Sequence, residues 1–351
     1  MAHILLPPDW QARELDVTPE HVYRNRRQFI RDLGLGTIAL STVTGLAACT
    51  SDESRGAERT ASPENPLATI PADAPREGYP ATRNARYTVP ERAVSERLPA
   101  SSYNNFYEFR NTGDLKTLWH LTGDYDPFPR KLEVSGLVEK PLTLDIADVI
   151  RSMELEERLY RFRCVEAWSM TVPWTGFPLR ALIERCKPLS KATHVRFVSA
   201  YEPEVMPGIQ QSLSWNYYDW PYYEGLRMDE AMNELAFVAT GMYGEPLPKQ
   251  NGSPWRMVLP WKYGYKGAKA FVKLEFVDRQ PGTFWNTLEP REYGFFSNVN
   301  PNNPHPRWSQ ATEEILGTGD RVPTKLFNGY EEWVGQLYPD EPKKPVRPTP
   351  I

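Results

Sequence analysis

Cysteine and histidine are scarce in this sequence: three Cys and five His occur among 351 residues. A zinc or iron site built from several histidines would therefore have few ligands available. The chain also contains no CxxCH sequence for haem attachment and no cysteine set for an iron–sulfur cluster. It has neither a GxGxxG nor a P-loop pattern. These absences argue against the common protein-bound metal centres and against the usual nucleotide-binding motifs.

An excess of charge of one sign is also missing, since the net charge is −4 and the pI is about 5.9. We therefore expect no nucleic-acid partner.

Proline (34 residues) and aromatic residues (12%) are plentiful. Both disfavour a helix bundle and favour a loop-rich fold that contains strands.

The apolar run at 33–48 has sixteen residues without a charge, whereas a membrane-spanning helix needs about 20. A basic stretch, RNRRQFIR (24–31), precedes it. This layout is typical of an export signal, and the RRQFI at 26–30 resembles the twin-arginine type that exports folded proteins. We therefore predict an export signal over 1–48 and a periplasmic location. The alternative is a basic, amphipathic start to an ordinary helix, which the glycines in the run would weaken.

Three further segments are expected after this signal. The run ends in Leu-Ala-Ala-Cys49, which resembles a lipoprotein processing box; cleavage nearby without lipid is the alternative. Residues 49–100 are rich in Ser, Pro, Glu, Ala and Arg, and are predicted to form a poorly ordered linker. A folded domain is expected over 101–335, followed by a proline-rich tail at 336–351.

Within that domain, short strands and helices alternate without a βαβ rhythm. Strands are predicted at 131–138, 158–164, 194–200, 236–240, 257–260 and 270–277. Helices are predicted at 143–150 and 177–186. This pattern favours an α+β fold of mixed strands, short helices and long loops.

Cys164 lies in the stretch RFRCVEAWSMTVPW (161–174) and allows four interpretations. It could form a disulfide with Cys186 in an oxidising compartment, or both could be buried thiols that act as small apolar groups. It could be a nucleophile with a base elsewhere in the fold. It could also be a single thiolate ligand to a transition metal, if an organic cofactor supplied the other donor atoms.

Longer blocks of sequence carry a resemblance. They are YNNFYEF (103–109), RFRCVEAWSMTVPWTGFPL (161–179), YYEGLRMDEAM (222–232), QNGSPWRMVLPWKYGYKGAK (250–269), EYGFFSNVNP (292–301) and HPRWSQATE (305–313). In these blocks the chain resembles the molybdenum-bearing catalytic subunits of periplasmic protein-methionine-sulfoxide reductases, which have the sulfite-oxidase-like fold. The resemblance spans residues 103–333.

The resemblance implies a molybdopterin cofactor, one per chain and without a nucleotide extension. Cys164 falls where the family's thiolate binds molybdenum, and Ser199 falls where better-known members carry threonine. The other implied cofactor contacts are Asn104, Tyr107, Glu108, Asn251, Arg256, Gly267, Ala268 and Lys269. These residue types suit the cofactor, because Arg256 and Lys269 can neutralise its phosphate. Small residues at 267 and 268 let the main chain approach it.

The resemblance also implies the reaction: reduction of methionine sulfoxide in oxidised periplasmic proteins, a repair reaction in which oxygen passes from the sulfoxide to Mo(IV). Electrons would come from quinol through a separate haem-containing inner-membrane subunit. Glu166 is a candidate for relaying protons or orienting substrate; its alternative role is to pair with Arg161 or Arg163. Trp168 and Trp174 could line a wall for the methionine side chain or pack in the core.

Two rival functions are left open by the sequence. A sulfite dehydrogenase on the same fold would run the metal in the oxidative direction and would favour an arginine-rich pocket for a dianion. An exported binding protein would contain a Cys164–Cys186 disulfide and no redox metal.

Overall fold

The computed structural model describes residues 65–110, 117–213 and 218–345. All of them belong to one compact unit, Glu58–Ile351. The predicted export signal and Cys49 lie outside the described residues. In the part of the chain that is described, no helix has both the length and the apolar character needed to cross a membrane.

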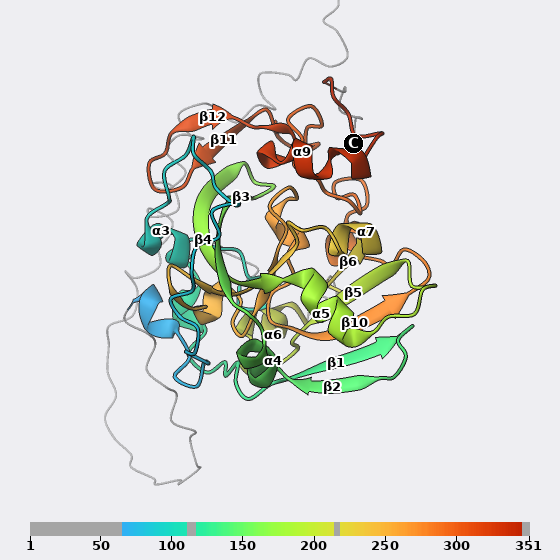
Figure 1. Cartoon of the computed structure of the whole chain (residues 1–351). Helices are drawn as coiled ribbons and strands as arrows, with labels where there is room; N and C mark the ends of the chain where they lie inside the picture. The colour runs from blue at the N-terminus through green and yellow to red at the C-terminus, as the bar shows by residue number, and fades with distance from the viewer. Residues whose placement is uncertain (1–64, 111–116, 214–217, 346–351) are drawn as a thin grey trace, which may run out of the picture. The chain divides into compact units, whose positions relative to one another are not determined.

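Five strands form the first sheet, in the order β2-β1-β10-β5-β6. Their bounds are β1 (Lys131–Gly136), β2 (Leu142–Asp145), β5 (His194–Ser199), β6 (Tyr223–Arg227) and β10 (Phe271–Val277). β1 and β10 run parallel, and the other neighbours run antiparallel. The hairpin of β1 and β2 lies at the edge of this sheet (Figure 1).

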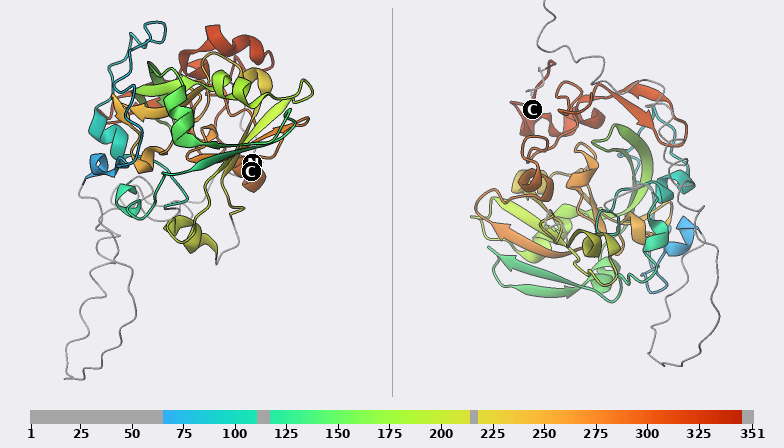
Figure 2. Two further views of the ribbon diagram at one scale, coloured as in Figure 1. Left: turned by 60° about the horizontal axis from the view of Figure 1, so that its bottom comes forward. Right: turned by 180° about the vertical axis from the view of Figure 1, so that it is seen from behind.

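Seven strands form the second sheet, which carries the long hairpin of β3 and β4. Its strands are β3 (Glu156–Arg163), β4 (Trp168–Pro178), β7 (Phe237–Met242), β8 (Glu245–Pro246), β9 (Arg256–Val258), β11 (Thr312–Ile315) and β12 (Arg321–Pro323). β11 pairs with the start of β4, and β7 pairs with its end. The β3–β4 hairpin and the β11–β12 hairpin therefore lie side by side (Figures 1 and 2).

The described helices are short. They are α3 (Arg97–Ser102), α4 (Ile146–Ser152), α5 (Leu179–Cys186), α6 (Pro207–Leu213), α7 (Met228–Ala231), α8 (Phe284–Leu288) and α9 (Glu331–Val334). In α5, the buried residues Leu179, Leu182, Ile183 and Cys186 follow helical spacing, so one face packs on the core. The helix ends at Lys187, which has the left-handed conformation typical of a C-terminal cap.

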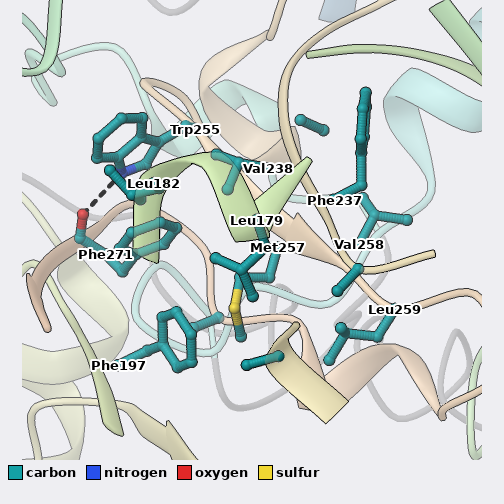
Figure 3. Close-up of a cluster of buried hydrophobic side chains, with 14 of the residues drawn as sticks. Leu179, Leu182, Phe197, Phe237, Val238, Trp255, Met257, Val258, Leu259 and Phe271 are labelled. Carbon is teal, nitrogen blue, oxygen red and sulfur yellow. Dashed lines mark hydrogen bonds between the residues drawn. The ribbon is translucent and has the colours of Figure 1, made fainter. Parts of the chain in front are cut away.

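The main core contains side chains from both sheets and from α5 (Figure 3). Phe197 and Phe271 come from the first sheet, while Phe237 and Met257 come from the second. Trp255 stacks on Phe271 with ring centroids 5.0 Å apart, and its indole N–H donates to the Phe271 carbonyl at 2.9 Å. Because each fully buried side chain of this size stabilises the fold by about 1.5–3 kcal/mol, this cluster fixes the two sheets that frame the site.

The α+β class predicted from the sequence is confirmed, and each of the six predicted strands overlaps an observed strand. The helix predicted from residue 143 is wrong at its start: residues 142–145 form β2, and the helix begins at Ile146. Asp145 caps α4 by accepting the Asp148 N–H at 3.1 Å. The strands β2, β4, β6, β8, β11 and β12 were not predicted.

The described parts of the two segments expected outside the domain also differ from the prediction. Residues 65–100 contribute Ala74, Tyr87 and Ala100 to the main core, so this part is not a loose linker. Likewise Tyr338, in the predicted tail, is buried and accepts a hydrogen bond from Trp261 Nε1 at 2.9 Å. Both segments bury isolated apolar residues that have no period in the sequence.

Candidate functional site

Cys164 lies in the turn that joins β3 to β4. Its N–H donates to the Trp168 carbonyl at 2.9 Å, and its carbonyl accepts the Ala167 N–H at 3.1 Å. Ala167 adopts a left-handed φ of 67°, which closes the turn. The thiol is 8% exposed and lies on the wall of a cavity of about 550 Å³, called the main cavity below.

Side chains from outside the turn fix its main chain. The Arg163 guanidinium donates to the Cys164 carbonyl. Trp308 Nε1 and Gln310 Nε2 both donate to the Val165 carbonyl, at 2.7 and 2.8 Å. These bonds hold the two peptide groups after the thiol, so the direction of the Cys164 side chain is set by rigid neighbours.

The carboxylate of Glu166 lies beside the thiol. Its Oε2 oxygen accepts hydrogen bonds from Asn105 Nδ2 and Trp168 Nε1, both at 3.1 Å. The same oxygen is 3.9 Å from the Cys164 sulfur. Two donors thus orient this carboxylate at the wall of the cavity.

The alternative role for Glu166, an ion pair with a neighbouring arginine, is wrong. Arg161 pairs with Glu91, and Arg163 pairs with Glu313 at 3.0 Å. Neither arginine is part of the cavity lining.

Cys164 and Cys186 are both buried thiols and are not joined in a disulfide. The disulfide interpretation, and with it the disulfide-bonded binding protein, is therefore wrong. Burial raises the pKa of Cys186 to about 12, as expected for an inert core thiol. Of the two candidate tryptophans, Trp168 lines the cavity, whereas Trp174 is fully buried in the core.

The loop after α3 supplies a second part of the wall. Phe106 and Phe109 are each 1% exposed and anchor this loop in a separate core cluster. The residues between and before them, Asn104, Tyr107 and Glu108, line the main cavity. Burial raises the pKa of Tyr107 and of Glu108. The positive charge of nearby Lys269 lowers the pKa of Glu108 and so opposes part of the effect of burial.

Two cations, Arg256 and Lys269, form a third part of the wall. They lie opposite each other on an isolated bridge; Arg256 is buried and Lys269 is partly buried. Burial lowers the pKa of Arg256 to about 10 and lowers the pKa of Lys269 as well, with Arg256 adding to the effect on Lys269. Among the described residues neither cation has a carboxylate at salt-bridge distance; Lys269 Nζ donates to the Asn105 carbonyl at 2.6 Å.

Two other lysines, both fully buried, form ion pairs with carboxylates. Lys262 pairs with Glu230 and Lys266 pairs with Glu224, each at 2.6 Å and with both partners fully buried. The contrast identifies the Arg256–Lys269 pair as a site for an anion, because a buried cation is normally neutralised by a partner.

Unsatisfied polar atoms mark the same region. Asn104 Oδ1, Ser199 Oγ, Asn251 Oδ1 and Arg256 Nη2 are buried and have no hydrogen-bond partner among the described residues. Each such atom costs about 1–3 kcal/mol, so the four together cost roughly 4–12 kcal/mol. This cost is comparable to the whole stability of a typical domain. A polar ligand with a phosphate and amide-like ring edges, such as a molybdopterin, fits this donor and acceptor set.

The main chain at 267–268 is packed tightly against β9. A Cβ at Gly267 would lie 2.4 Å from the Met257 carbonyl, so the position does not tolerate a side chain. The Ala268 carbonyl accepts the Met257 N–H at 3.0 Å.

Nine of the eleven predicted site residues line the main cavity: Asn104, Tyr107, Glu108, Cys164, Glu166, Asn251, Arg256, Gly267 and Lys269. Ser199 and Ala268 do not line it. Ser199 ends β5 and donates its N–H to the carbonyl of Tyr222, which does line the cavity. The structure thus brings segments around 104, 164, 251 and 269 together.

Several cavity residues were missed by the sequence reasoning. They are Asn105, Tyr218, Tyr222, Tyr265, Trp285, Glu289, Glu292, Tyr293, Arg307 and Trp308, among others. All of these except Tyr218, Trp285 and Glu289 lie inside the quoted sequence blocks, so their positions near the implied cofactor contacts were an available signal. Tyr218, Trp285 and Glu289 come from segments outside the blocks and line the same cavity.

Comparisons with known proteins identify relatives of the whole chain. The oxidoreductase molybdopterin binding domain family matches residues 123–285. The protein-methionine-sulfoxide reductase catalytic subunit MsrP of Burkholderia mallei is 44% identical over 330 residues, which cover 92% of each chain. The MsrP subunit of Pseudomonas syringae pv. tomato is 42% identical over 357 residues, covering 95% of this chain and 97% of that protein. A similar solved structure is the sulfane dehydrogenase SoxCD from Paracoccus pantotrophus, which is 18% identical. The match covers 61% of this chain and 58% of that chain, with a TM-score of 0.37.

Proposed function

Because the chain belongs to the family of protein-methionine-sulfoxide reductase catalytic subunits, we propose that it reduces methionine sulfoxide residues of proteins at a molybdenum–molybdopterin cofactor in the main cavity. The overall reaction is R–S(O)–CH₃ + 2 H⁺ + 2 e⁻ → R–S–CH₃ + H₂O. The observation that carries the proposal is the buried Cys164 thiol on the same cavity wall as the unpaired cations Arg256 and Lys269.

In this proposal the Cys164 thiolate binds the metal, and Arg256 and Lys269 hold the phosphate of the cofactor. The polar edges of the pterin are bound by Asn104, Tyr107, Glu108, Ser199 and Asn251, and by the main chain of Gly267 and Ala268. The unpaired atoms of Asn104, Ser199, Asn251 and Arg256 support this assignment, because the cofactor would satisfy them. The cofactor, when bound, supplies two electrons and accepts the sulfoxide oxygen.

The substrate side of the cavity suits an uncharged sulfur group. Trp168, Trp285, Tyr293 and Trp308 offer aromatic faces and edges to a methionine side chain, and sulfur–aromatic contacts are favourable by about 0.3–1.5 kcal/mol. Glu166 is the residue we assign to hold or deliver a proton at its Oε2 oxygen, since the departing oxygen must leave as water.

The rival substrate, sulfite, is disfavoured by charge. Outside the cofactor contacts, the described residues that line the cavity include the carboxylates of Glu166, Glu289 and Glu292 and the guanidinium of Arg307. Arg307 is paired with Glu292 at 2.6 Å. The carboxylates on this wall repel a dianion, whereas a neutral sulfoxide carries no net charge for them to repel.

The proposal extends to the setting of the enzyme. We propose export to the periplasm in the folded state, with Cys49 as a lipid anchor if it is processed. Electrons would come from quinol through a haem-containing inner-membrane subunit, because the sequence has no haem or iron–sulfur ligands of its own. The cofactor is proposed to lack a nucleotide extension, and the activity would repair oxidised periplasmic proteins.

The test uses the purified holoenzyme with a reduced viologen dye as electron donor. We expect stoichiometric molybdenum, dye oxidation with methionine sulfoxide in peptides, and no oxidation of sulfite with an electron-accepting dye. Quinol should support turnover only after membranes containing the haem subunit are added. Sulfite oxidation without sulfoxide reduction would overturn the substrate assignment, and turnover of quinol by the isolated chain would overturn the electron route.

A further inference from the structure

A second cavity, of about 430 Å³, adjoins the main cavity. Val165, Tyr265 and Glu292 line both, so the two share a wall. Val165 immediately follows Cys164 in the chain. The second cavity therefore begins next to the position at which a sulfoxide would react.

The wall of the second cavity is aromatic. Phe296 is 37% exposed, which makes it one of the few large apolar side chains exposed in the described part of the chain. Its ring lies 5.6 Å from that of Phe295 and 5.7 Å from that of Tyr338, both in edge-on arrangements. An exposed aromatic ring that is supported by two buried rings is a rigid, preformed contact surface.

The charged side chains that line the second cavity are mostly acidic. Asp340 and Glu341 contribute carboxylates to its lining, Glu292 contributes one that is paired with Arg307 at 2.6 Å, and Arg227 contributes a guanidinium. Arg227 is already paired with Asp229 at 2.9 Å. The surface is therefore expected to favour basic over acidic side chains in whatever occupies it.

A methionine sulfoxide in a protein cannot enter the main cavity alone, because the chain continues on both sides of it. An extended chain advances about 3.3–3.6 Å per residue, so the residues next to the sulfoxide must lie against the rim. The second cavity shares Val165, Tyr265 and Glu292 with the main cavity, and aromatic rings are part of its lining.

We propose that the second cavity binds the polypeptide segment next to the methionine sulfoxide, with the Phe296 ring as the contact for an apolar or aromatic neighbour and with acidic neighbours disfavoured. This subsite rests on the proposed function, since it assumes that the sulfoxide reacts beside Cys164. It would make the enzyme select sulfoxides by the sequence around them, whereas free methionine sulfoxide would use the main cavity alone.

The experiment compares holoenzyme variants on free methionine sulfoxide and on N-acetylated tripeptides in which methionine sulfoxide is flanked by phenylalanine, lysine or glutamate. For Phe296→Ala we expect the KM of the phenylalanine peptide to rise about tenfold, with kcat and all constants for the free amino acid within twofold of wild type. The wild type should prefer the lysine peptide to the glutamate peptide, and Asp340→Asn should reduce that preference. Tyr201→Ala removes an exposed aromatic side chain that lines neither cavity, and should change nothing.

Equal effects of Phe296→Ala on peptide and free amino acid, or no effect on either, would overturn the subsite. So would unchanged peptide kinetics with a loss of electron transfer from the membrane subunit, because the cavity would then dock that subunit. Calorimetric binding of the same peptides to the oxidised holoenzyme separates this inference from the proposed function. Binding that depends on Phe296 without any sulfoxide reduction would retain the subsite and refute the reaction.

Discussion

The Oε2 oxygen of Glu166 lies 3.9 Å from the sulfur of Cys164, held there by donors from Asn105 and Trp168. Replacing Glu166 by Gln keeps the size of the side chain but removes its charge and its ability to carry a proton. We predict that kcat for methionine sulfoxide falls by about 100-fold or more, while molybdenum content and thermal stability stay the same.

Steady-state kinetics with a reduced dye measure this effect. Glu314→Gln serves as the matched control, because Glu314 is exposed on β11 and lines neither cavity. Turnover of the Glu166 variant within twofold of wild type would refute the assigned role.

Arg256 carries a buried charge whose Nη2 has no hydrogen-bond partner among the described residues. Arg256→Met should therefore leave the cofactor-free protein as stable as wild type or more stable, by up to about 4 kcal/mol. The same variant should be purified with little or no molybdenum, because the anion contact is lost. Chemical denaturation of apoprotein and elemental analysis measure the two effects.

Arg163→Met is the contrasting variant. It removes the fully buried ion pair with Glu313, which keeps only Arg92 as a partner, and it removes the hydrogen bonds to the Cys164 carbonyl and Gln310. It should therefore lower the free energy of unfolding by about 3–5 kcal/mol. If both variants destabilise the apoprotein to the same extent, Arg256 does not belong to an anion site.

The Cys186 thiol gives a pH dependence of known sign. Burial raises its pKa from 9.0 to about 12, so between these values the native state keeps a proton that the unfolded state releases. Its contribution is fully present below pH 9 and is lost as the pH rises toward 12. Over this window the unfolding free energy of wild type should fall more steeply than that of Cys186→Ala, by about 1.4 kcal/mol per pH unit.

Urea denaturation between pH 9 and 10.5 measures both slopes. Comparing slopes removes the constant cost of the cavity that alanine leaves. Parallel slopes would show that Cys186 titrates normally in the folded protein.

The sequence predicted strands with clear alternation, such as β1, and missed β4, β11 and β12. Residues 131–136 alternate between exposed and buried positions and were predicted as a strand. β4 is buried along nearly its whole length and contains Pro173, so it shows neither alternation nor an uninterrupted run of strand formers. β11 and β12 have three or four residues each, too few for a period to appear.

Most of the site was predictable because it lies in long sequence blocks. Cys164, Arg256 and Lys269 were identified in this way, and the structure places them on one wall. The second cavity was not predictable, because it forms where the loop of Phe296 meets the segment of Tyr338. Only tertiary packing brings these two segments together, and neither carries a local pattern that indicates a binding site.

The central claim is that the Cys164 sulfur binds molybdenum in the main cavity, and X-ray absorption at the molybdenum edge tests it most directly. Wild type and Cys186→Ser should show the same metal environment, whereas Cys164→Ser should lose one sulfur neighbour of the metal together with sulfoxide reduction. An unchanged sulfur shell and near-normal turnover in Cys164→Ser would contradict the account.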